Sequence, residues 1–292
     1  MRISEFVYRA LRHLGILDIL NDTFFLKMSY RVLLGKKLHL ENPKSFNEKI
    51  QWLKLNNCRP EYVQMVDKAE AKKYIRIHAG EKYVIPTLQI CEQFNQIDFQ
   101  KLPSQFVIKC THDSSGVVVV KDYTQFDYMK AKRKIEHSLR RNYYYRGREV
   151  LYKSIKPRII VEKYMEDESG QLIDYKVHCF NGKAKVILVC KDRFKQSGLT
   201  ETFYDAAWTR MNVKRPNHNC SAEEIRKPEI LEEMLEAAEK LSAGIPFLRV
   251  DFYIIRDRLY IGEFTFYPAS GFQRFEPSEY DDIFGEWLDL PK

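Results

Sequence analysis

The chain has 292 residues, of which 45% are hydrophobic and 30% are charged, so it can form a core and is not a disordered protein. Its formal net charge of +8 favours anionic partners, such as nucleotides, acidic glycans, nucleic acid or anionic lipid, without choosing among them. The apolar run over residues 3–20 is interrupted by Glu5, Arg9, Arg12 and Asp18, so we expect neither a signal peptide nor a membrane span there. This basic amphipathic segment can still contact a membrane peripherally, although docking on the protein core is the simpler use.

Six cysteines are spread along the chain without a C-x-x-C pair. Cys110, Cys179 and Cys190 lie in apolar, strand-like runs, where a free cysteine behaves as a small hydrophobic residue. We therefore expect reduced cysteines and a cytoplasmic protein, rather than a disulfide or zinc framework.

The hydrophobic pattern predicts helices and hairpins that alternate along the chain. Residues 1–60 are expected to be mostly helical, with Ser45 and Glu48 forming a capping box at the start of one helix. The elements expected after residue 60 are a helix opening at Asp67, a strand at 83–88, a strand pair at 106–110 and 117–120, a helix at 126–141, a strand at 158–164, a hairpin of 173–180 and 183–191, a helix at 228–241, and a hairpin of 248–253 and 259–264. This alternation indicates the α+β class, not a doubly wound parallel sheet.

The last of these hairpins carries one acid on each strand. If Ile255 pairs with Leu259 across a three-residue turn, Asp251 lies opposite Glu263, and both carboxylates share one face with Arg249. Two opposed carboxylates repel each other unless a cation lies between them. One interpretation is a clamp for a divalent metal, suited to Mg²⁺ on phosphate. The other is an acidic pair neutralised by nearby Arg or Lys side chains on a solvated sheet face.

Three further stretches place polar groups in or near strands. The loop of residues 111–116, with Lys109 at its start, can turn backbone N–H groups toward an anion, or it can be an ordinary turn. The strand end at 162–165 can hydrogen-bond the edge of an adenine, or it can hold a salt pair at the sheet edge. Lys176 and Arg193 can stabilise phosphate or a developing oxyanion, or they can belong to a sheet with one solvated face.

Several common site motifs do not occur in the sequence. The chain contains neither G-x-x-x-x-G-K-[ST] nor G-x-G-x-x-G, which argues against a P-loop or Rossmann site. Without a nucleophile elbow or a Cys–His pair at a family spacing, covalent hydrolase chemistry has little support. The basic and aromatic stretch 130–148 could bind nucleic acid, but a solvated helix face or a surface for an acidic glycan fits it better.

The order of these motifs resembles the ATP-grasp superfamily, in which two α+β subdomains hold ATP between them. It is most similar to the TupA-like ATP-grasp proteins of bacterial surface-polysaccharide clusters. The resemblance runs from about residue 25 to the end, and these segments carry it: 42–52, 67–68, 107–109, 162–164, 174–176, 249–251, 262–263 and 269–272. It implies a helical N-terminal extension over 1–60, an N-terminal subdomain over 61–104, a lid subdomain over 105–163, and a C-terminal subdomain with the metal site over 164–292.

The resemblance also implies roles for individual residues. Lys68 and Lys109 would contact the ATP phosphates, and Asp251 and Glu263 would hold Mg²⁺. A loop would close over the phosphates and a strand end would line the adenine; these residues are Ser114, Ser115 and Gly116 in the loop, and Glu162, Lys163, Tyr164 and Met165 at the strand end. The chain departs from the common pattern twice: the usual Glu-x-Asn metal triplet ends at Thr265, and the loop is poor in glycine.

These roles imply a Mg²⁺-dependent carboxylate–amine ligase that joins its substrates through an acylphosphate. Arg193 or Arg249 would stabilise the tetrahedral intermediate, with assistance from Lys176. The implied substrates are a small-molecule or glycan carboxylate, such as a uronic acid, amino acid or peptide, and an amine, bound for a capsule or cell-wall polymer. The alternatives are a sugar kinase or glycosyltransferase using the same site, and a basic polymer-binding module without turnover.

Overall fold

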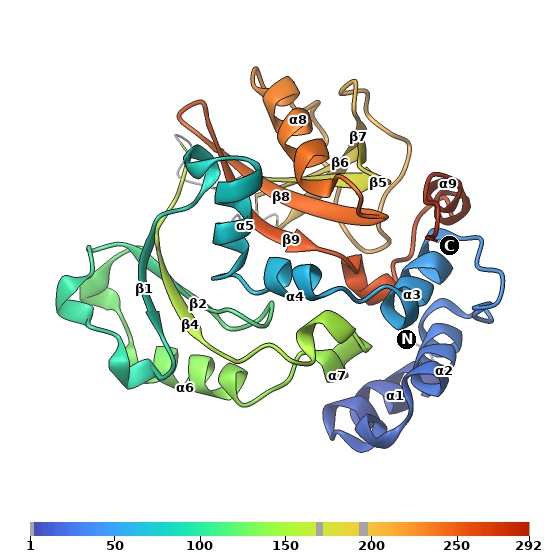
Figure 1. Cartoon of the computed structure of the whole chain (residues 1–292), viewed down its shortest axis with the longest axis horizontal. Helices are drawn as coiled ribbons and strands as arrows, with labels where there is room; N and C mark the ends of the chain where they lie inside the picture. Colours follow the sequence, from blue (N-terminus) through green and yellow to red (C-terminus); the bar gives the residue numbers. More distant parts are fainter. Residues whose placement is uncertain (1–2, 168–171, 193–197, 292) are drawn as a thin grey trace.

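Two antiparallel sheets and their surrounding helices make up the part of the chain that the computed structural model describes, residues 3–167, 172–192 and 198–291 (Figure 1). The smaller sheet has the strand order β1-β4-β2-β3, and the larger has the order β7-β6-β5-β8-β9. The strands are β1 Thr87–Cys91, β2 Phe106–Cys110, β3 Val117–Val120, β4 Ile159–Lys163, β5 Asp174–Phe180, β6 Lys183–Lys191, β7 Thr200–Asp205, β8 Phe247–Ile255 and β9 Arg258–Thr265. The α-helices are α1 Ile3–His13, α2 Asp22–Leu34, α3 Phe46–Asn56, α4 Pro60–Val66, α5 Ala71–His78, α6 Tyr128–Leu139, α7 Tyr144–Gly147, α8 Leu231–Ser242 and α9 Tyr280–Glu286. This arrangement confirms the predicted α+β class.

The N-terminal helices α1 and α2 lie at one edge of the molecule, on the opposite side from the small sheet (Figure 1). They pack around a core of their own that includes Phe25, Leu26 and Tyr30. The predicted capping box at the start of α3 is confirmed, because the Glu48 N–H donates to Ser45 Oγ and the Ser45 N–H donates to Glu48 Oε2. Such a reciprocal cap satisfies two N–H groups that the helix itself leaves without partners.

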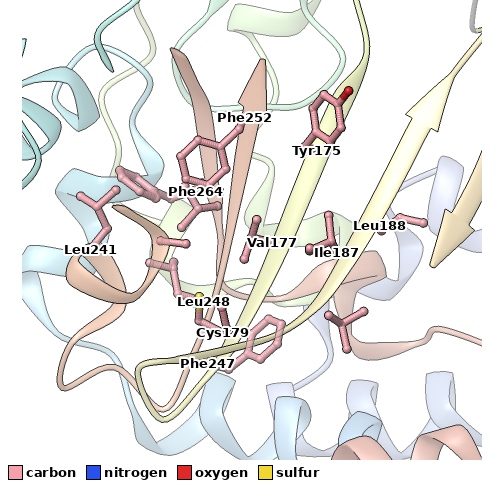
Figure 2. Close-up of a cluster of buried hydrophobic side chains, with 14 of the residues drawn as sticks. Tyr175, Val177, Cys179, Ile187, Leu188, Leu241, Phe247, Leu248, Phe252 and Phe264 are labelled. Atoms are coloured by element: carbon pink, nitrogen blue, oxygen red, sulfur yellow. The ribbon is translucent and has the colours of Figure 1, made fainter. Parts of the chain in front are cut away.

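The core of the larger sheet forms on the face covered by α8 (Figure 2). The residues drawn on this face include Tyr175, Val177, Cys179, Ile187, Leu241, Leu248, Phe252 and Phe264, while Leu188 and Phe247 alternate with Ile187 and Leu248 and lie on the opposite face. Burying one side chain of this size stabilises the fold by about 1.5–3 kcal/mol. Because side chains alternate along a strand, the residues between them in β5 and β8 face the other way, and these include Lys176 and Asp251.

The turn between β8 and β9 differs from the prediction. Ile255 pairs with Arg258, not with Leu259, so the turn has two residues instead of three. Both turn residues, Arg256 and Asp257, have left-handed backbone angles, with φ of 49° and 56°. Two-residue turns with positive φ match the natural twist of a hairpin, which is why the tighter turn forms.

A bulge in β9 restores the predicted alignment of the acids. Phe252 pairs with Ile261, but Asp251, its neighbour, pairs with Glu263. Gly262 is therefore an extra residue in β9, and it shifts the register by one. The shorter turn and the bulge cancel, so the prediction that the two acids lie opposite each other is confirmed.

The smaller sheet packs one face against α6, with Phe106 and Ile108 of β2 fully buried. Val107 and Lys109 alternate with them and face the other way. The strand expected at 83–88 lies slightly later, as β1, and pairs with β4 in this sheet. The division of the chain at residues 60, 104 and 163 stays a prediction.

Among the described residues, no helix is both long and apolar enough to cross a membrane.

Candidate active site

A cavity of about 250 Å³, here called the inter-sheet cavity, is lined by residues of both sheets. Its apolar lining residues are Ile85, Val107, Val117, Val119, Met165 and Leu172. Its charged lining residues are Lys68, Lys109, Lys121, Glu162, Lys163, Asp174, Lys176, Asp251 and Glu263. Ser114, Tyr164, Tyr253 and Gly262 complete the lining. The structure thus brings together most of the residues that the sequence assigned to a site.

On the small-sheet side of this cavity, the carboxylate of Glu162 binds two lysines. It is buried, and its two oxygens pair with Lys72 Nζ at 2.5 Å and Lys109 Nζ at 2.6 Å. Lys72 Nζ also donates to the carbonyl of Ile85 at 2.6 Å. Burial would raise the pKa of Glu162, but the two lysine charges outweigh it and lower that pKa to about 2. Glu162 therefore stays ionised and fixes the position of Lys109.

Asp251 is the corresponding carboxylate on the large-sheet side, and it is almost completely buried. Arg249 binds both oxygens of the Asp251 carboxylate: Nε donates to Oδ1 at 2.6 Å, and Nη2 donates to Oδ2 at 2.8 Å. Lys176 also donates to Oδ2. Arg249 Nη2 also lies 3.4 Å from Glu263 Oε1. Burial would raise the pKa of Asp251, but the charges of Arg249 and Lys176 lower it to about 2. Arg249 and Lys176 thus neutralise Asp251, as the second interpretation of the hairpin expected, but the solvated face in that interpretation is wrong, because Asp251 is buried.

The pair Asp251 and Glu263 still fits a magnesium ion on a nucleotide. Mg²⁺ commonly binds one or two carboxylates and takes its other ligands from phosphates and water. Glu263 is half-buried, and its one ion pair with another described residue is the 3.4 Å contact between Oε1 and Arg249, which leaves Oε2 available. No group of three or more His, Cys, Asp and Glu side chains among the described residues is arranged as a metal site, which agrees with Thr265 standing where a third ligand was expected. Metal binding at Asp251 requires Lys176 or Arg249 to move away from it.

The loop of residues 111–116 is organised by Asp113, not by an anion. The Asp113 carboxylate accepts hydrogen bonds from the Gly116 N–H at 3.0 Å, from Ser115 Oγ at 3.0 Å, and from the Ser138 hydroxyl. A Cβ at Gly116 would lie 2.6 Å from Ser138 Oγ, so the loop needs glycine there. The Gly116 N–H is therefore already bound by Asp113, and the closing of this loop over phosphates stays a prediction.

Lys68 and Ser114 place two polar groups on the inner side of this loop. The Lys68 N–H donates to the carbonyl of Thr111 at 3.0 Å, and its ammonium group donates to the carbonyl of Asp113. Ser114 Oγ donates to the hydroxyl of Tyr143 at 2.8 Å. The helix expected to open at Asp67 begins instead at Ala71, as α5, and Lys68 lies in the turn before it.

A second cavity of about 540 Å³, here called the polar cavity, adjoins the first and shares Lys68, Ser114 and Glu263 with it. Its remaining charged or titratable lining residues are Glu5, Arg9, Arg12, Asp113, Tyr143, Arg146, Glu149, Tyr152, His218, Arg249, Tyr267 and Arg274. Of the guanidinium groups, that of Arg146 has no carboxylate within 4.0 Å among the described residues, and Arg274 donates to the carbonyl of Leu33. The polar cavity therefore carries cationic groups that can receive an anionic ligand.

Behind this cavity, Lys54 and Glu149 form a buried pair of opposite charge. Lys54 Nζ donates to the carbonyls of Gly147 at 2.6 Å and Ser270 at 2.7 Å, and to Gln51 Oε1 at 2.9 Å. The Ser270 hydroxyl donates to Glu149 Oε1. Burial lowers the pKa of Lys54 to about 7 and raises that of Glu149, and the attraction between the two opposes both shifts. The pKa values of Lys54 and Glu149 therefore lie closer to neutral pH than those of Glu162 and Asp251 in the inter-sheet cavity.

Sequence reasoning did not identify Lys72, Lys54, Arg146 or Glu149 as site residues. The stretch 130–148 was interpreted as a solvated face, but Arg148 at its end is buried and donates to three carbonyls of the N-terminal region. The spacing of Gln51 and Lys54 on α3 was the one available signal for a polar strip facing inward. Arg193 lies outside the described residues.

The two sheets and the cavity between them define an ATP-grasp fold. Residues 48–289 match the family model described as TupA-like ATPgrasp, and the chain belongs to this family. No curated protein matches the chain at a significant level.

The chain is similar to solved structures of ligases at low sequence identity. An L-amino acid ligase from Bacillus licheniformis is 15% identical, with a TM-score of 0.50, over 84% of this chain and 56% of its own. A D-alanine–D-alanine ligase from Bacillus anthracis in complex with ATP is 17% identical, with a TM-score of 0.41, over 77% of this chain and 58% of its own. The corresponding enzyme from Helicobacter pylori is 16% identical, with a TM-score of 0.43, over 85% of this chain and 70% of its own. The chain thus spans less than two thirds of the length of the first two proteins.

Proposed function

We propose that the protein is an ATP- and Mg²⁺-dependent carboxylate–amine ligase that works through an acylphosphate. The observation that carries this proposal is that the two cavities share a wall at Lys68, Ser114 and Glu263. One cavity has the apolar walls and lysines that suit a nucleotide, and the other is larger, polar and rich in cations, which suits an acid and an amine. Placing the γ-phosphate at the shared wall would bring it within reach of an acid in the polar cavity.

In this proposal the inter-sheet cavity holds ATP. The adenine lies against its apolar walls and the strand end formed by Glu162, Lys163, Tyr164 and Met165, all of which line the cavity. Lys68 and Lys109 contact the phosphates, and the Ser114-Ser115-Gly116 loop closes over them by its hydroxyls. Asp251 and Glu263 would hold Mg²⁺, which when bound neutralises charge on the phosphate oxygens.

The reaction has two balanced steps. A carboxylate oxygen of the acid attacks the γ-phosphorus, the bond to the bridging oxygen breaks, and ADP leaves. The amine nitrogen then attacks the acyl carbon, the carbon–oxygen bond to phosphate breaks, and phosphate leaves while the nitrogen loses a proton. Arg249, whose guanidinium lines the polar cavity, stabilises the developing negative charge, and Lys176 supports it through Asp251. Arg193 lies outside the described residues, so its role in stabilising the tetrahedral intermediate stays a prediction from the sequence.

Glu149 is the group best placed to serve the amine. It lines the polar cavity, is buried, and accepts one hydrogen bond from Ser270. Burial raises its pKa, which suits a carboxylate that takes a proton from a substrate ammonium group. Its position beside Arg146 would place the amine near the cations that receive the acid.

The acid we propose is a uronic acid or an amino acid that becomes part of a capsule or other cell-surface polysaccharide. The cationic lining of the polar cavity supports an acidic substrate. We place the enzyme in the cytoplasm, where ATP is available, in contact with polysaccharide assembly at the inner face of the membrane. All six cysteines are free, which agrees with a reducing compartment.

The test measures ADP release and amide formation with a panel of uronic and amino acids as carboxylates and amino acids as amines, and traps the acylphosphate with hydroxylamine. Glu263→Gln should lower ADP release about a hundredfold while the protein stays folded, because Glu263 is half-buried and its loss leaves no buried charge alone. Asp251→Asn is less clean, since it would leave Arg249 and Lys176 buried without their partner. Glu61→Gln, at an exposed site, is the matched control.

Three outcomes would contradict the proposal. A stable phosphoester or glycoside without an amide would favour a kinase or a glycosyltransferase. No heat of binding with Mg·ATP in calorimetry would favour a polymer-binding module without turnover. Full activity in Glu263→Gln would remove the proposed metal site.

A further inference from the structure

The first helix, α1, presents three different faces. Tyr8 is buried in the core that α1 shares with α2, whereas Arg9 and Arg12 line the polar cavity. The third face is apolar and exposed, with Phe6 60% and Val7 47% accessible to solvent. An apolar stripe on a helix of a globular protein normally packs against other protein, so this third face needs another explanation.

The exposed apolar surface extends beyond α1 into the two elements that follow it. Ile16 and Ile19, in a short 3₁₀ helix, and Phe24, at the start of α2, are 50%, 89% and 54% accessible. We call this exposed surface the apolar cap, and its members are Phe6, Val7, Leu14, Ile16, Ile19 and Phe24. Six of the thirteen large exposed hydrophobic side chains among the described residues thus lie between residues 6 and 24, a concentration that marks an interaction site.

The segment that carries the cap is rich in positive charge. Residues 1–40 contain seven Lys and Arg and three Asp and Glu. Two of these acids are engaged within the protein, since Glu5 pairs with Arg9 at 2.7 Å and Asp22 accepts a hydrogen bond from the hydroxyl of Tyr144. On α2 the exposed Lys27 and Arg31 follow Phe24 by three and seven residues, which places them on the same side of the helix.

The cap is also firmly held on the body of the protein. The buried guanidinium of Arg148 donates to the carbonyls of Leu17 and Asp18 at 3.0 Å and of Leu20 at 2.9 Å. These carbonyls come from the short helix that exposes Ile19. The apolar side chains therefore sit on an anchored platform, and they do not need to refold to meet a partner.

We propose that the apolar cap docks on an anionic lipid bilayer, with its apolar side chains in the interfacial layer and its lysines and arginines on the lipid phosphates. A basic amphipathic surface with Phe and Ile at its centre binds such a layer through buried apolar area and electrostatic attraction. A second copy of this chain fits less well, because a two-fold contact through the cap would bring its basic side chains face to face. This inference goes beyond the proposed reaction and does not depend on it.

Docking in this way would place the polar cavity close to the membrane. The same helix, α1, contributes Arg9 and Arg12 to the cavity wall and Phe6 to the cap. One helix with its side chains is about 10–12 Å across, so the cavity would lie roughly that far from the lipid surface. A ligand attached to a lipid could then reach the cavity without leaving the membrane.

The experiment is cosedimentation of the full chain with vesicles of phosphatidylcholine alone and with vesicles containing phosphatidylglycerol, at low and high salt. We expect binding to the anionic vesicles that weakens as salt is raised. The triple variant Phe6→Ser, Ile19→Ser, Phe24→Ser should lower the partition coefficient at least about tenfold. A control triple variant, Ile77→Ser, Ile90→Ser, Met129→Ser, removes equally exposed apolar side chains from elsewhere and should bind as the unaltered protein does.

Three results would overturn the inference. The first is a failure of the unaltered protein to bind the anionic vesicles, and the second is a control triple variant that loses as much binding as the cap variant. Alternatively, sedimentation analysis could show a dimer that the cap variant converts to a monomer, with no vesicle binding, which would assign the cap to a second copy of the chain. Equal melting temperatures of the two triple variants verify that both are folded.

Discussion

The two adjoining cavities differ in how they treat buried charge. In the inter-sheet cavity two buried carboxylates are each held by two cations: Glu162 by Lys72 and Lys109, and Asp251 by Arg249 and Lys176. Neither carboxylate can take up a proton near neutral pH, because the cations lower both pKa values to about 2. Both carboxylates are therefore ionised and fixed in position by their cations.

In the polar cavity the charged side chains are not all paired with a partner of opposite charge. Arg146 has no carboxylate partner among the described residues, and burial moves the pKa values of Lys54 and Glu149 toward neutral pH. The difference teaches that one cavity is preorganised around fixed charge, as suits a constant cosubstrate, while the other can exchange protons and accept anions.

The largest effect is expected on removing the shared partner in the inter-sheet cavity. Glu162→Gln leaves the ammonium groups of Lys72 and Lys109 buried together without a counter-charge. Breaking a buried ion pair from one side costs about 3–5 kcal/mol, so the free energy of unfolding should fall by that amount. Urea unfolding measures this change directly.

The control for Glu162→Gln is a pair at the surface. Glu233→Gln removes the partner of the exposed Lys82 and should leave the urea midpoint nearly unchanged, because exposed pairs contribute little. Restoring balance in the double variant Glu162→Gln, Lys72→Met should recover part of the lost stability. Equal urea midpoints for Glu162→Gln and Glu233→Gln would mean that the buried charges are not held as the distances indicate.

Much of the inter-sheet cavity was predictable because its residues lie on regular strands. The alternation over 248–264 placed Asp251 and Glu263 on one sheet face, and the turn at Asn181-Gly182 has the positive φ angles that this residue pair favours. The turn at Arg256-Asp257 was missed because neither residue is a typical former of a two-residue turn. Gly262 was the available sign of the bulge, since glycine within a strand often marks one.

Most of the polar cavity could not be predicted from the sequence, because its residues come from segments far apart in the chain. Arg12 Nη1 reaches the carbonyl of Arg146, 134 positions later, and Lys54 reaches Gly147. Such contacts depend on how helices dock, which periodicity within one helix does not specify. The roles of individual residues in catalysis stay predictions for the same reason, because they depend on ligand geometry.

A middle-sized effect is expected at Arg146 in the polar cavity. Arg146→Gln removes a cation that has no carboxylate partner within the described residues, so stability should hardly change. Affinity for an acidic ligand should fall about tenfold, as one charge-assisted hydrogen bond is lost. The measurement is retention of the protein on immobilised polygalacturonate. Arg133→Gln on α6 removes the same charge from an exposed site and should leave retention unchanged; equal losses would mean that net charge alone binds the polymer.

The smallest effect is a change in how stability depends on pH. Burial lowers the folded-state pKa of Lys54 to about 7, whereas in the unfolded chain a lysine keeps a pKa of about 10.4. Below pH 7 both states carry the proton, and above it the unfolded state binds more protons than the folded state, so stability rises with pH. This group should add about 1 kcal/mol to the free energy of unfolding between pH 7 and pH 8.

Lys54→Met should abolish that rise, because methionine does not titrate. Urea unfolding at pH 7.0, 7.5 and 8.0 gives the slope, which is independent of any overall loss of stability from the hydrogen bonds that Lys54 makes to Gly147 and Ser270. The exposed Lys37→Met should keep the slope of the unaltered protein. If Lys54→Met keeps it as well, the polar cavity holds its charge as firmly as the inter-sheet cavity, and the contrast between the two would rest on Arg146 alone.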